Sequence, residues 1–244
     1  MSMDKKILII IPAWNEEKSI ADVVREVQRE LPTVDVLVVD DGSMDSTAEQ
    51  GRRAGAHVLR LPYNLGVGGA MRLGYRYAED NGHDIAIQID ADGQHDPRFV
   101  PQLVAALDHA DLVIGARFAG TGDYTVRGPR RYAMRLLAVV LSRITGTRLS
   151  DTTSGFRAAN RRVIEMFAHA YPVEYLGDTI ETVVHTARSR FKVLQVPVAM
   201  RPRAAGTPSQ SPLKATLYLT RAVAVLGLAL IRRYPLPQEQ VKQV

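Results

Sequence analysis

The chain has 244 residues, of which 46% are hydrophobic and 23% are charged, and it contains no cysteine. This is the composition of a globular protein, and the lack of cysteine excludes a disulfide framework, thiolate catalysis and a Cys-ligated zinc site. The formal net charge of +5 favours an anionic partner, such as a nucleic acid, a membrane surface or a phosphorylated substrate. We expect a cytoplasmic protein, because the missing cysteines suit a reducing compartment and residues 1–6 do not resemble a signal peptide.

Apolar runs and amphipathic stretches alternate along the chain. Continuous aliphatic runs are typical of strands covered on both faces in a parallel sheet, and apolar residues spaced three and four apart are typical of helices. Strands are predicted at 5–11, 34–39, 57–61, 85–90 and 112–116, with an extended run at 191–200, and helices at 20–31, 43–54, 71–80, 97–109, 130–145, 161–168 and 179–189. This alternation predicts an α/β fold with a doubly wound, mainly parallel sheet flanked by helices.

The central predicted strand ends in two carboxylates one residue apart, Asp90 and Asp92. In open α/β sheets, ligands bind at the carboxyl ends of the strands. Two carboxylates and the amide oxygen of Gln94 form an oxygen-only ligand set suited to Mg²⁺ or Mn²⁺, and such ions commonly carry phosphates. The alternative is that both aspartates only form a turn and cap the helix that begins near Pro97. We favour a site, because the earlier strands also end in polar or glycine-rich residues at the same predicted edge.

Gly66, Gly68 and Gly69 precede a predicted helix and suggest a dinucleotide-binding loop, since glycines let backbone N–H groups approach phosphate. The G-x-G-x-x-G motif, however, belongs after the first strand, where this chain has no glycine. The Walker motif G-x-x-x-x-G-K-[S/T] is absent from the sequence. The sequence therefore argues against a Rossmann oxidoreductase and excludes a P-loop enzyme.

Six short motifs follow one another between residues 7 and 206. They are Pro12-Ala13-Trp14-Asn15-Glu16-Glu17, Val39-Asp40-Asp41-Gly42-Ser43, Asn64-Leu65-Gly66, Asp90-Ala91-Asp92-Gly93-Gln94, Gly115-Ala116-Arg117 and Asp151-Thr152-Thr153-Ser154-Gly155-Phe156-Arg157. In this order they resemble the motifs of inverting GT-A-type glycosyltransferases of family 2, and most of all those of the dolichol-phosphate mannose synthase group. The resemblance implies a GT-A fold and the transfer of a sugar from a nucleotide sugar.

The resemblance also implies roles for individual positions. Asp92 and Gln94 match metal ligands that neutralise the diphosphate, whose negative charge grows as it departs. Catalytic roles fall on Asp92, Arg117 and Arg131. The positions that match nucleotide-sugar binding are Pro12, Trp14, Glu16, Asp41, Asn64, Asp90, Ala91 and Arg203, and those that match acceptor binding are Arg117, Arg131, Arg135, Ser154 and Arg157.

The chain departs from the family pattern in two places. Processive polysaccharide synthases carry a Q-x-x-R-W motif, and the only tryptophan here is Trp14, which argues against that activity. Many relatives have lysine after a serine of the loop at 201–212, but here Ser209 precedes Gln210. We therefore give Ser209 no role.

The density of arginine favours a phosphate acceptor. A lipid phosphate, with a second pKa near about 6, is already largely a dianion at neutral pH and needs cations rather than a base. Arg131 and Arg135 are four residues apart on a predicted helix and therefore share a face. A hydroxyl acceptor would instead need a general base, and Asp178 or Glu181 could supply it. Their spacing also fits a capped helix start, with Asp178 as the N-cap.

The last part of the chain, residues 213–244, is predicted to hold an amphipathic helix that follows a catalytic domain at 1–212. Its longest charge-free run, 222–231, is about half the roughly 20 residues that a spanning helix requires. Lys214, Arg221 and Arg232 share one side of the helical projection. Such a basic stripe suits a membrane interface, and an apolar helix suits a homodimer contact or core packing almost as well.

These observations predict a metal-dependent, inverting transfer of a hexose to a polyprenyl phosphate by an enzyme held peripherally on the cytoplasmic face of the membrane. Its partners would be a nucleotide sugar, either GDP-mannose or a UDP-hexose, the lipid phosphate and an anionic membrane surface, without nucleic acid. One alternative is a sugar nucleotidyltransferase, although the segment 12–17 lacks the glycine-rich basic loop that such enzymes carry. Another is a non-catalytic module that binds a sugar nucleotide or a lipid.

Overall fold

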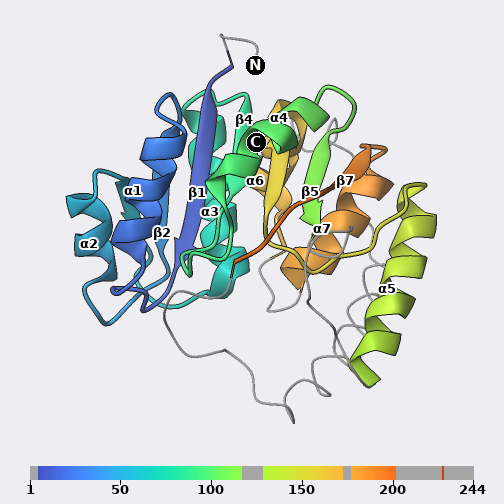
Figure 1. Cartoon of the computed structure of the whole chain (residues 1–244), viewed down its shortest axis with the longest axis horizontal. Coiled ribbons are helices and arrows are strands. Elements are labelled where there is room, and N and C mark those ends of the chain that lie inside the picture. The colour runs from blue at the N-terminus through green and yellow to red at the C-terminus, as the bar shows by residue number, and fades with distance from the viewer. Residues whose placement is uncertain (1–4, 117–128, 173–176, 202–226, 228–244) are drawn as a thin grey trace.

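A computed structural model describes residues 5–116, 129–172, 177–201 and 227, with the side chains of 129–135, 177 and 178 left out (Figure 1). The strands are β1 (Ile7–Ala13), β2 (Asp35–Asp40), β3 (His57–Arg60), β4 (Ile85–Gln88), β5 (Leu112–Ala116), β6 (Arg157–Asn160) and β7 (Val193–Pro197). The helices are α1 (Ile20–Glu30), α2 (Thr47–Arg53), α3 (Gly66–Asp80), α4 (Val100–Ala106), which follows a 3₁₀ turn at Pro97–Phe99, α5 (Pro129–Thr145), α6 (Arg161–Ala170) and α7 (Gly177–Arg188).

The seven strands form one sheet in the order β3-β2-β1-β4-β6-β5-β7. All pairs are parallel except those of β6, which runs antiparallel to both β4 and β5. The predicted mainly parallel α/β sheet is therefore confirmed. Because β6 is reversed, its first residue lies at the edge where the parallel strands end. The loop that precedes β6 consequently reaches the same edge as the loops that follow β1, β2 and β4.

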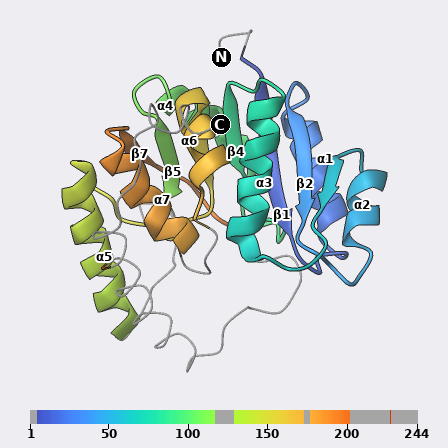
Figure 2. The same cartoon turned by 180° about the vertical axis from the view of Figure 1, so that it is seen from behind.

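The sheet separates two apolar layers, and alternating residues of β1 feed them. Ile9 and Ile11 pack on one face with α1 and α4, whereas Leu8 and Ile10 pack on the other with α3, α6 and α7. Figures 1 and 2 show these helices on opposite faces of the sheet. The four side chains are fully buried, so the first predicted strand has the two-sided cover expected of a parallel sheet.

The predicted elements are present, but several boundaries move. Helix α2 begins at Thr47 rather than residue 43, because the residues before it bond to the loop after β1. Helix α3 begins at Gly66, five residues before the predicted start. Glycine in α3 serves close packing: a Cβ on Gly74 would lie 2.5 Å from a methyl carbon of Ile10. Gly66, Gly68 and Gly69 are predicted to form a loop before the helix, but they belong to its first turn.

Strand β6 was not predicted. Residues 151–157 are predicted as a loop and 161–168 as a helix, and Arg-Ala-Ala-Asn has no β-branched residue that would indicate a strand. The strand forms because its backbone is paired on both sides and its two alanines are fully buried between β4 and β5.

Within the described residues, none of the helices is both long and apolar enough to cross a bilayer. The predicted boundary near residue 212 and the basic stripe of Lys214, Arg221 and Arg232 lie outside the described residues, as do Ser209 and Gln210. Of the predicted C-terminal helix, the structure describes only Gly227, which is helical.

Candidate active site

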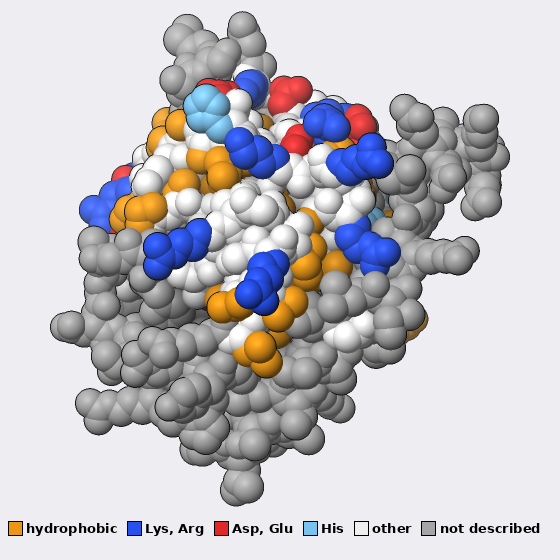
Figure 3. Space-filling view, turned by 90° about the vertical axis from the view of Figure 1, so that its right-hand side faces the viewer, with side chains coloured by type: hydrophobic (Ala, Val, Ile, Leu, Met, Phe, Trp, Pro, Cys, Tyr) orange, Lys and Arg blue, Asp and Glu red, His pale blue; other side chains and the backbone are white. Residues whose placement is uncertain are grey.

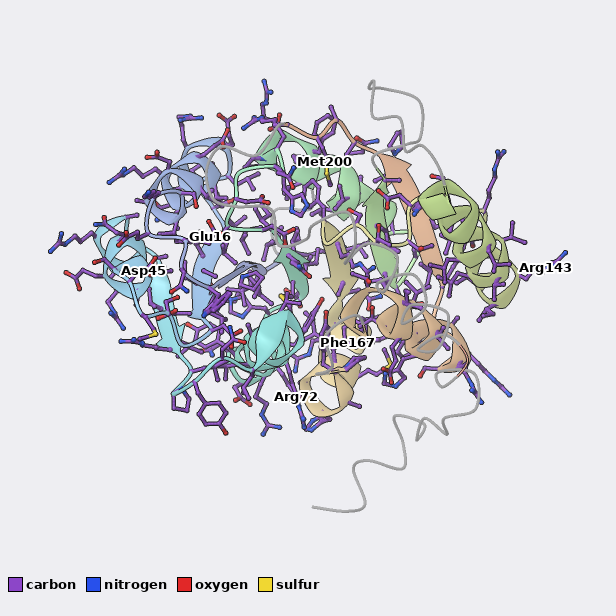
Figure 4. All side chains as sticks on the ribbon, turned by 90° about the horizontal axis from the view of Figure 1, so that it is seen from below. Glu16, Asp45, Arg72, Arg143, Phe167 and Met200 are labelled. Atoms are coloured by element: carbon purple, nitrogen blue, oxygen red, sulfur yellow. The ribbon has the colours of Figure 1, made fainter. Side chains whose placement is uncertain are left out.

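The carboxyl ends of β1, β2 and β4 meet at one edge of the sheet, as their parallel pairing requires. Figure 4 views the molecule from this edge and labels Glu16, which follows β1, and Met200, which follows β7. The site is described below as a donor side, made by the loops after β1, β2, β3 and β4, and an acceptor side, made by residues 151–157 and α7.

The loops after β1 and β2 are fastened to each other by hydrogen bonds. The backbone N–H of Asn15 donates to Ser43 Oγ at 2.9 Å, and the backbone N–H of Met44 donates to Asn15 Oδ1 at 3.0 Å. Asn15 has a φ of +55°, a left-handed conformation that asparagine tolerates well. These hydrogen bonds hold the loop after β1 so that Trp14, which is 54% exposed, and Glu16 lie at the carboxyl edge of the sheet. Pro12, also predicted to bind nucleotide, lies within β1.

Asp41 connects the end of β2 to the start of α3. Its Oδ1 accepts the backbone N–H of Leu65 at 2.7 Å, and burial raises the pKa of the Asp41 carboxyl, although the N–H groups of Leu65 and Gly66 oppose this. The loop before α3 packs tightly here, since a Cβ on Gly42 (φ +70°) would lie 2.6 Å from the Tyr63 backbone. Asn64 closes the same turn by accepting the N–H of Gly66 at 3.1 Å.

The paired carboxylates follow β4. Asp92 is buried and its Oδ1 accepts the backbone N–H of Gln94 at 3.0 Å, while Gly93 turns the chain with a φ of +77°. The Asp90 side chain is 38% exposed, and its Oδ1 accepts from Gln88 Nε2 at 3.0 Å. Ala91, between them, is buried. One oxygen of Asp92 thus closes the turn, which does not preclude a ligand at the carboxylate, and Asp90 keeps an open side.

Two carboxylates fit a divalent ion that a bound diphosphate helps to hold. Among the residues that the structure describes, no group of three or more His, Asp or Glu side chains is placed to hold a metal by itself. Mg²⁺ is commonly bound through one or two carboxylates together with substrate phosphates and waters. Asp92 and the side-chain amide of Gln94, with Asp90 beside them in the same loop, are oxygen ligands of the kind that such an ion takes.

On the acceptor side, the predicted residues are largely internal. Ser154 is 1% exposed and its Oγ accepts the N–H of Phe156 at 3.3 Å. Arg157 is 3% exposed and donates to the carbonyls of Ser154, Thr152 and Thr179 and to Thr182 Oγ1, at 2.6 to 3.0 Å. Arg157 thus fastens the loop 151–156 to α7, a role that no local sequence pattern indicates.

The other arginines are only partly described. Arg131 and Arg135 lie on α5, without described side chains, whereas Arg117 and Arg203 lie outside the described residues. The two alternative bases lie on α7. Glu181 is buried at 7% exposure, and the side chain of Asp178 is outside the described set.

The acceptor loop meets the donor side at Asp90. A Cβ on Gly155 would lie 2.9 Å from Gln88 Nε2 and 3.1 Å from each carboxylate oxygen of Asp90. The backbone conformation of Gly155 does not require glycine, so this close approach explains why a glycine is present. His95, which the sequence analysis did not single out, also contacts Asp90, and its only signal in the sequence was its place directly after Gln94.

Ion pairs join the loop after β4 to α1 and to the end of β7. Asp96 bonds to Arg98 Nε at 3.0 Å and to a terminal nitrogen of Arg201 at 2.8 Å, and Arg201 also bonds to Glu26 at 2.7 Å. Hydrogen bonds from Arg98, with the charge of Arg201 beside them, lower the pKa of the Asp96 carboxyl to about 2. The backbone N–H of Arg201 further donates to the carbonyl of Gln94 at 3.1 Å.

The mainly parallel seven-stranded sheet flanked by helices is that of a GT-A-type glycosyltransferase. Residues 8–167 match the family model described as Glycosyl transferase family 2, and the chain belongs to this family. It is therefore a glycosyltransferase, as the resemblance implied.

Two curated relatives extend along most of the chain. An undecaprenyl-phosphate mannosyltransferase of Micrococcus luteus is 32% identical over 215 residues, which cover 84% of this chain and 88% of that protein. A polyprenol monophosphomannose synthase of Mycolicibacterium smegmatis is 30% identical over 216 residues, covering 85% and 82%.

A solved structure has the same fold at lower identity. Glucosyl-3-phosphoglycerate synthase from Mycobacterium tuberculosis, crystallised with Mn²⁺, UDP and glucosyl-3-phosphoglycerate, superposes with a TM-score of 0.70 at 23% identity. The match covers 93% of this chain and 80% of that one.

Proposed function

We propose that this glycosyltransferase transfers a hexose from a nucleoside-diphosphate sugar to a polyprenyl phosphate, with inversion at the sugar carbon. The observation that carries the proposal is the position of Asp90 and Asp92: they follow β4 between the fastened donor loops and the acceptor loop, which touches Asp90 through Gly155. The two curated relatives named for undecaprenyl-phosphate and polyprenol substrates support a lipid phosphate as the acceptor.

In this proposal the donor side binds the nucleotide sugar. Trp14 is half exposed at the edge, and Asp41 there has a buried carboxylate, an acceptor group of the kind to which a base or ribose donates hydrogen bonds. The full proposed set is Pro12, Trp14, Glu16, Asp41, Asn64, Asp90, Ala91 and Arg203. The donor would be GDP-mannose or a UDP-hexose.

Asp92 and Gln94 would hold Mg²⁺ or Mn²⁺, which would neutralise the diphosphate as it departs. The proposed metal rests on the carboxylate geometry at the end of β4. The crystal of the glucosyl-3-phosphoglycerate synthase also contains Mn²⁺.

A phosphate dianion attacks without losing a proton, so the acceptor side would need cations and not a base. Arg117, Arg131 and Arg135 are the proposed cations, and Ser154 and Arg157 complete the predicted acceptor set. Arg157 has internal acceptors for its donors, and we propose that it serves the acceptor by holding the loop 151–156 in shape.

The proposal is tested with the purified chain, labelled GDP-mannose, UDP-glucose and UDP-N-acetylglucosamine, and two matched acceptors, undecaprenyl phosphate and undecaprenol. We expect one donor to be used, with transfer to the phosphate alone, release of nucleoside diphosphate, inversion by NMR of the product and loss of activity with EDTA. Transfer to undecaprenol would favour a hydroxyl acceptor with Asp178 or Glu181 as base. Exchange of pyrophosphate would indicate a nucleotidyltransferase, and binding without turnover a non-catalytic module.

We also propose that the enzyme docks peripherally on the anionic cytoplasmic leaflet. Helix α5 exposes Leu136 and Val139, and on the side of the molecule that carries α5 basic side chains are spread among apolar ones (Figure 3). Basic residues near such a leaflet contribute about 1 kcal/mol each. Sedimentation with anionic vesicles should retain the chain at low salt and release it at high salt. Equal, negligible pelleting of the full chain and of a truncation after residue 212 would contradict docking.

A further inference from the structure

His95 lies in the loop after β4, enclosed by the acceptor loop and the end of β7. It is 3% exposed, and its ring stacks on that of Phe156 with centroids 4.9 Å apart and an interplanar angle of 13°. Its backbone forms an antiparallel bridge with Met200. The ring is therefore fixed in place by contacts that do not involve Asp90.

The hydrogen bonding of His95 defines its tautomer. Nδ1 lies 3.0 Å from the backbone nitrogen of Asp90, and a backbone N–H can only donate, so Nδ1 must accept. In a neutral ring the proton then resides on Nε2. That atom lies 3.6 Å from Oδ2 of Asp90, which is a close electrostatic contact rather than a full hydrogen bond.

The Asp90 carboxylate is thus confined on several sides. Gln88 donates to Oδ1 at 3.0 Å, Nε2 of His95 faces Oδ2, and the Cα of Gly155 leaves no room for a side chain. The remaining side is open, since the side chain is 38% exposed. A carboxylate held in one direction and open on one side is arranged to meet a ligand.

We propose that His95 is a positioning residue of the donor site. It orients Asp90 through the Asp90 backbone N–H and through Nε2, and by stacking on Phe156 it makes the position of Asp90 depend on the acceptor loop. The proposal rests on the proposed donor role of Asp90. A residue whose function was only to fill the core would not set the affinity for the donor.

Three variants at the site separate these roles. His95→Phe keeps an aromatic ring for Phe156 but has no nitrogen, and His95→Asn keeps an acceptor near Nδ1 but loses the ring. Asp90→Asn reports the donor role directly. The probes are GDP and UDP, each with MnCl₂, titrated by calorimetry. We expect His95→Phe to lower the affinity for the nucleotide that the wild type binds by about 10-fold or more, as the loss of an outer-sphere partner does. His95→Asn should lower this affinity less.

His83 is the matched control. It is a second buried histidine, 1% exposed, with Nε2 2.9 Å from Asp35, but it precedes β4 and so lies at the opposite end of that strand. His83→Phe should lower thermal stability without changing nucleotide affinity. In steady state, His95→Phe should raise KM for the donor and leave KM for the acceptor within about twofold.

The outcomes are distinguishable. If Asp90→Asn binds as wild type, the donor role of Asp90 fails and the positioning role fails with it. If Asp90→Asn weakens binding but both His95 variants do not, only the positioning role is overturned. Should His95→Phe not fold, His95→Asn and ¹⁵N NMR of the metal-free wild type still decide: the neutral ring must be the Nε2–H tautomer, and the Nδ1–H tautomer would contradict the proposal.

Discussion

The donor and acceptor sides of the sheet edge are built with different interactions. On the donor side, aspartates hold the loops by accepting backbone N–H groups or arginine N–H groups, as Asp41 and Asp96 do. On the acceptor side, Arg157 holds the loop by donating to neutral oxygens of Thr152, Thr179 and Thr182. Carboxylates thus hold the donor loops, whereas a guanidinium ties the acceptor loop to α7.

This difference determines how many hydrogen-bonding positions each charged residue can still offer to a ligand. A carboxylate has about four acceptor positions, so Asp90 can bond to Gln88 and still present an open side. The donors of Arg157 are directed at internal oxygens and the side chain is buried. Charged residues of a sequence motif can therefore bind a ligand on one side of a site and stabilise the fold on the other.

The largest expected effect is the loss of transfer in Asp92→Asn. The variant removes a charge from the edge but keeps an oxygen that can accept the N–H of Gln94, so the fold should survive. Losing one electrostatic contributor of this kind costs about 10²- to 10³-fold in kcat. Initial rates at saturating Mn²⁺ measure it, with the melting temperature as the control for folding. A rate within a few-fold of wild type would remove Asp92 from the site.

Arg157→Leu should show its main effect in stability. The change leaves several buried oxygens without their donor, at about 1–3 kcal/mol for each buried group, so we expect a loss of about 3 kcal/mol or more. Urea unfolding measures it, and Arg143→Leu on the exposed part of α5 is the control. A stable Arg157→Leu with a greatly raised KM for the acceptor would instead make Arg157 a ligand-binding residue.

Acid should weaken the donor side through Asp96. Its pKa in the folded protein is about 2, below the ordinary value of 3.8, so its contribution is fully present above pH 3.8 and is lost as the pH falls through 2. The shift corresponds to about 2 kcal/mol. The difference in unfolding free energy between wild type and Asp96→Asn should therefore shrink from neutral pH towards pH 2. A difference that stays constant with pH would contradict the assignment.

The smallest effect is expected for Gly155→Ala, where the two sides touch. The added methyl group meets Asp90 and Gln88, and such overpacking costs about 1–3 kcal/mol. Because the side chain of Asp90 is partly exposed and can shift, we expect mainly weaker binding of the nucleotide sugar. Its KM should rise by about 10-fold. Gly51→Ala in α2 is the control, since its nearest neighbour would lie 3.4 Å away. Unchanged donor kinetics would mean that the sides are not coupled at Asp90.

The donor side could be predicted from the sequence because its information is local. Strands β1, β2 and β4 each contain a continuous apolar run, and the residues that follow them lie at the edge, as Asp90 does after β4. The acceptor side depends on contacts between distant segments. Nothing in Arg-Ala-Ala-Asn indicates a strand until it lies between β4 and β5, and nothing near Arg157 indicates that α7 will supply its acceptors.

The same limit applies within the site. The apolar run predicted a strand that ends just before Asp90 and Asp92, and both residues do follow β4. It did not indicate the stacking of His95 on Phe156, which are 61 positions apart in the sequence, because that contact exists only once β6 is in place.

The reversed strand β6 also has a consequence for synthesis of the chain. Asn160 of β6 pairs with Ile85 of β4, 75 positions earlier. At about 5–20 residues per second, a ribosome needs roughly 4 to 15 seconds to make that interval. During this time β4 can join β1 but presents its other edge, with Ile85 and Ile87, to the surroundings. Open apolar edges recruit other strands, so the nascent chain should depend most on chaperones between the emergence of β4 and that of β6.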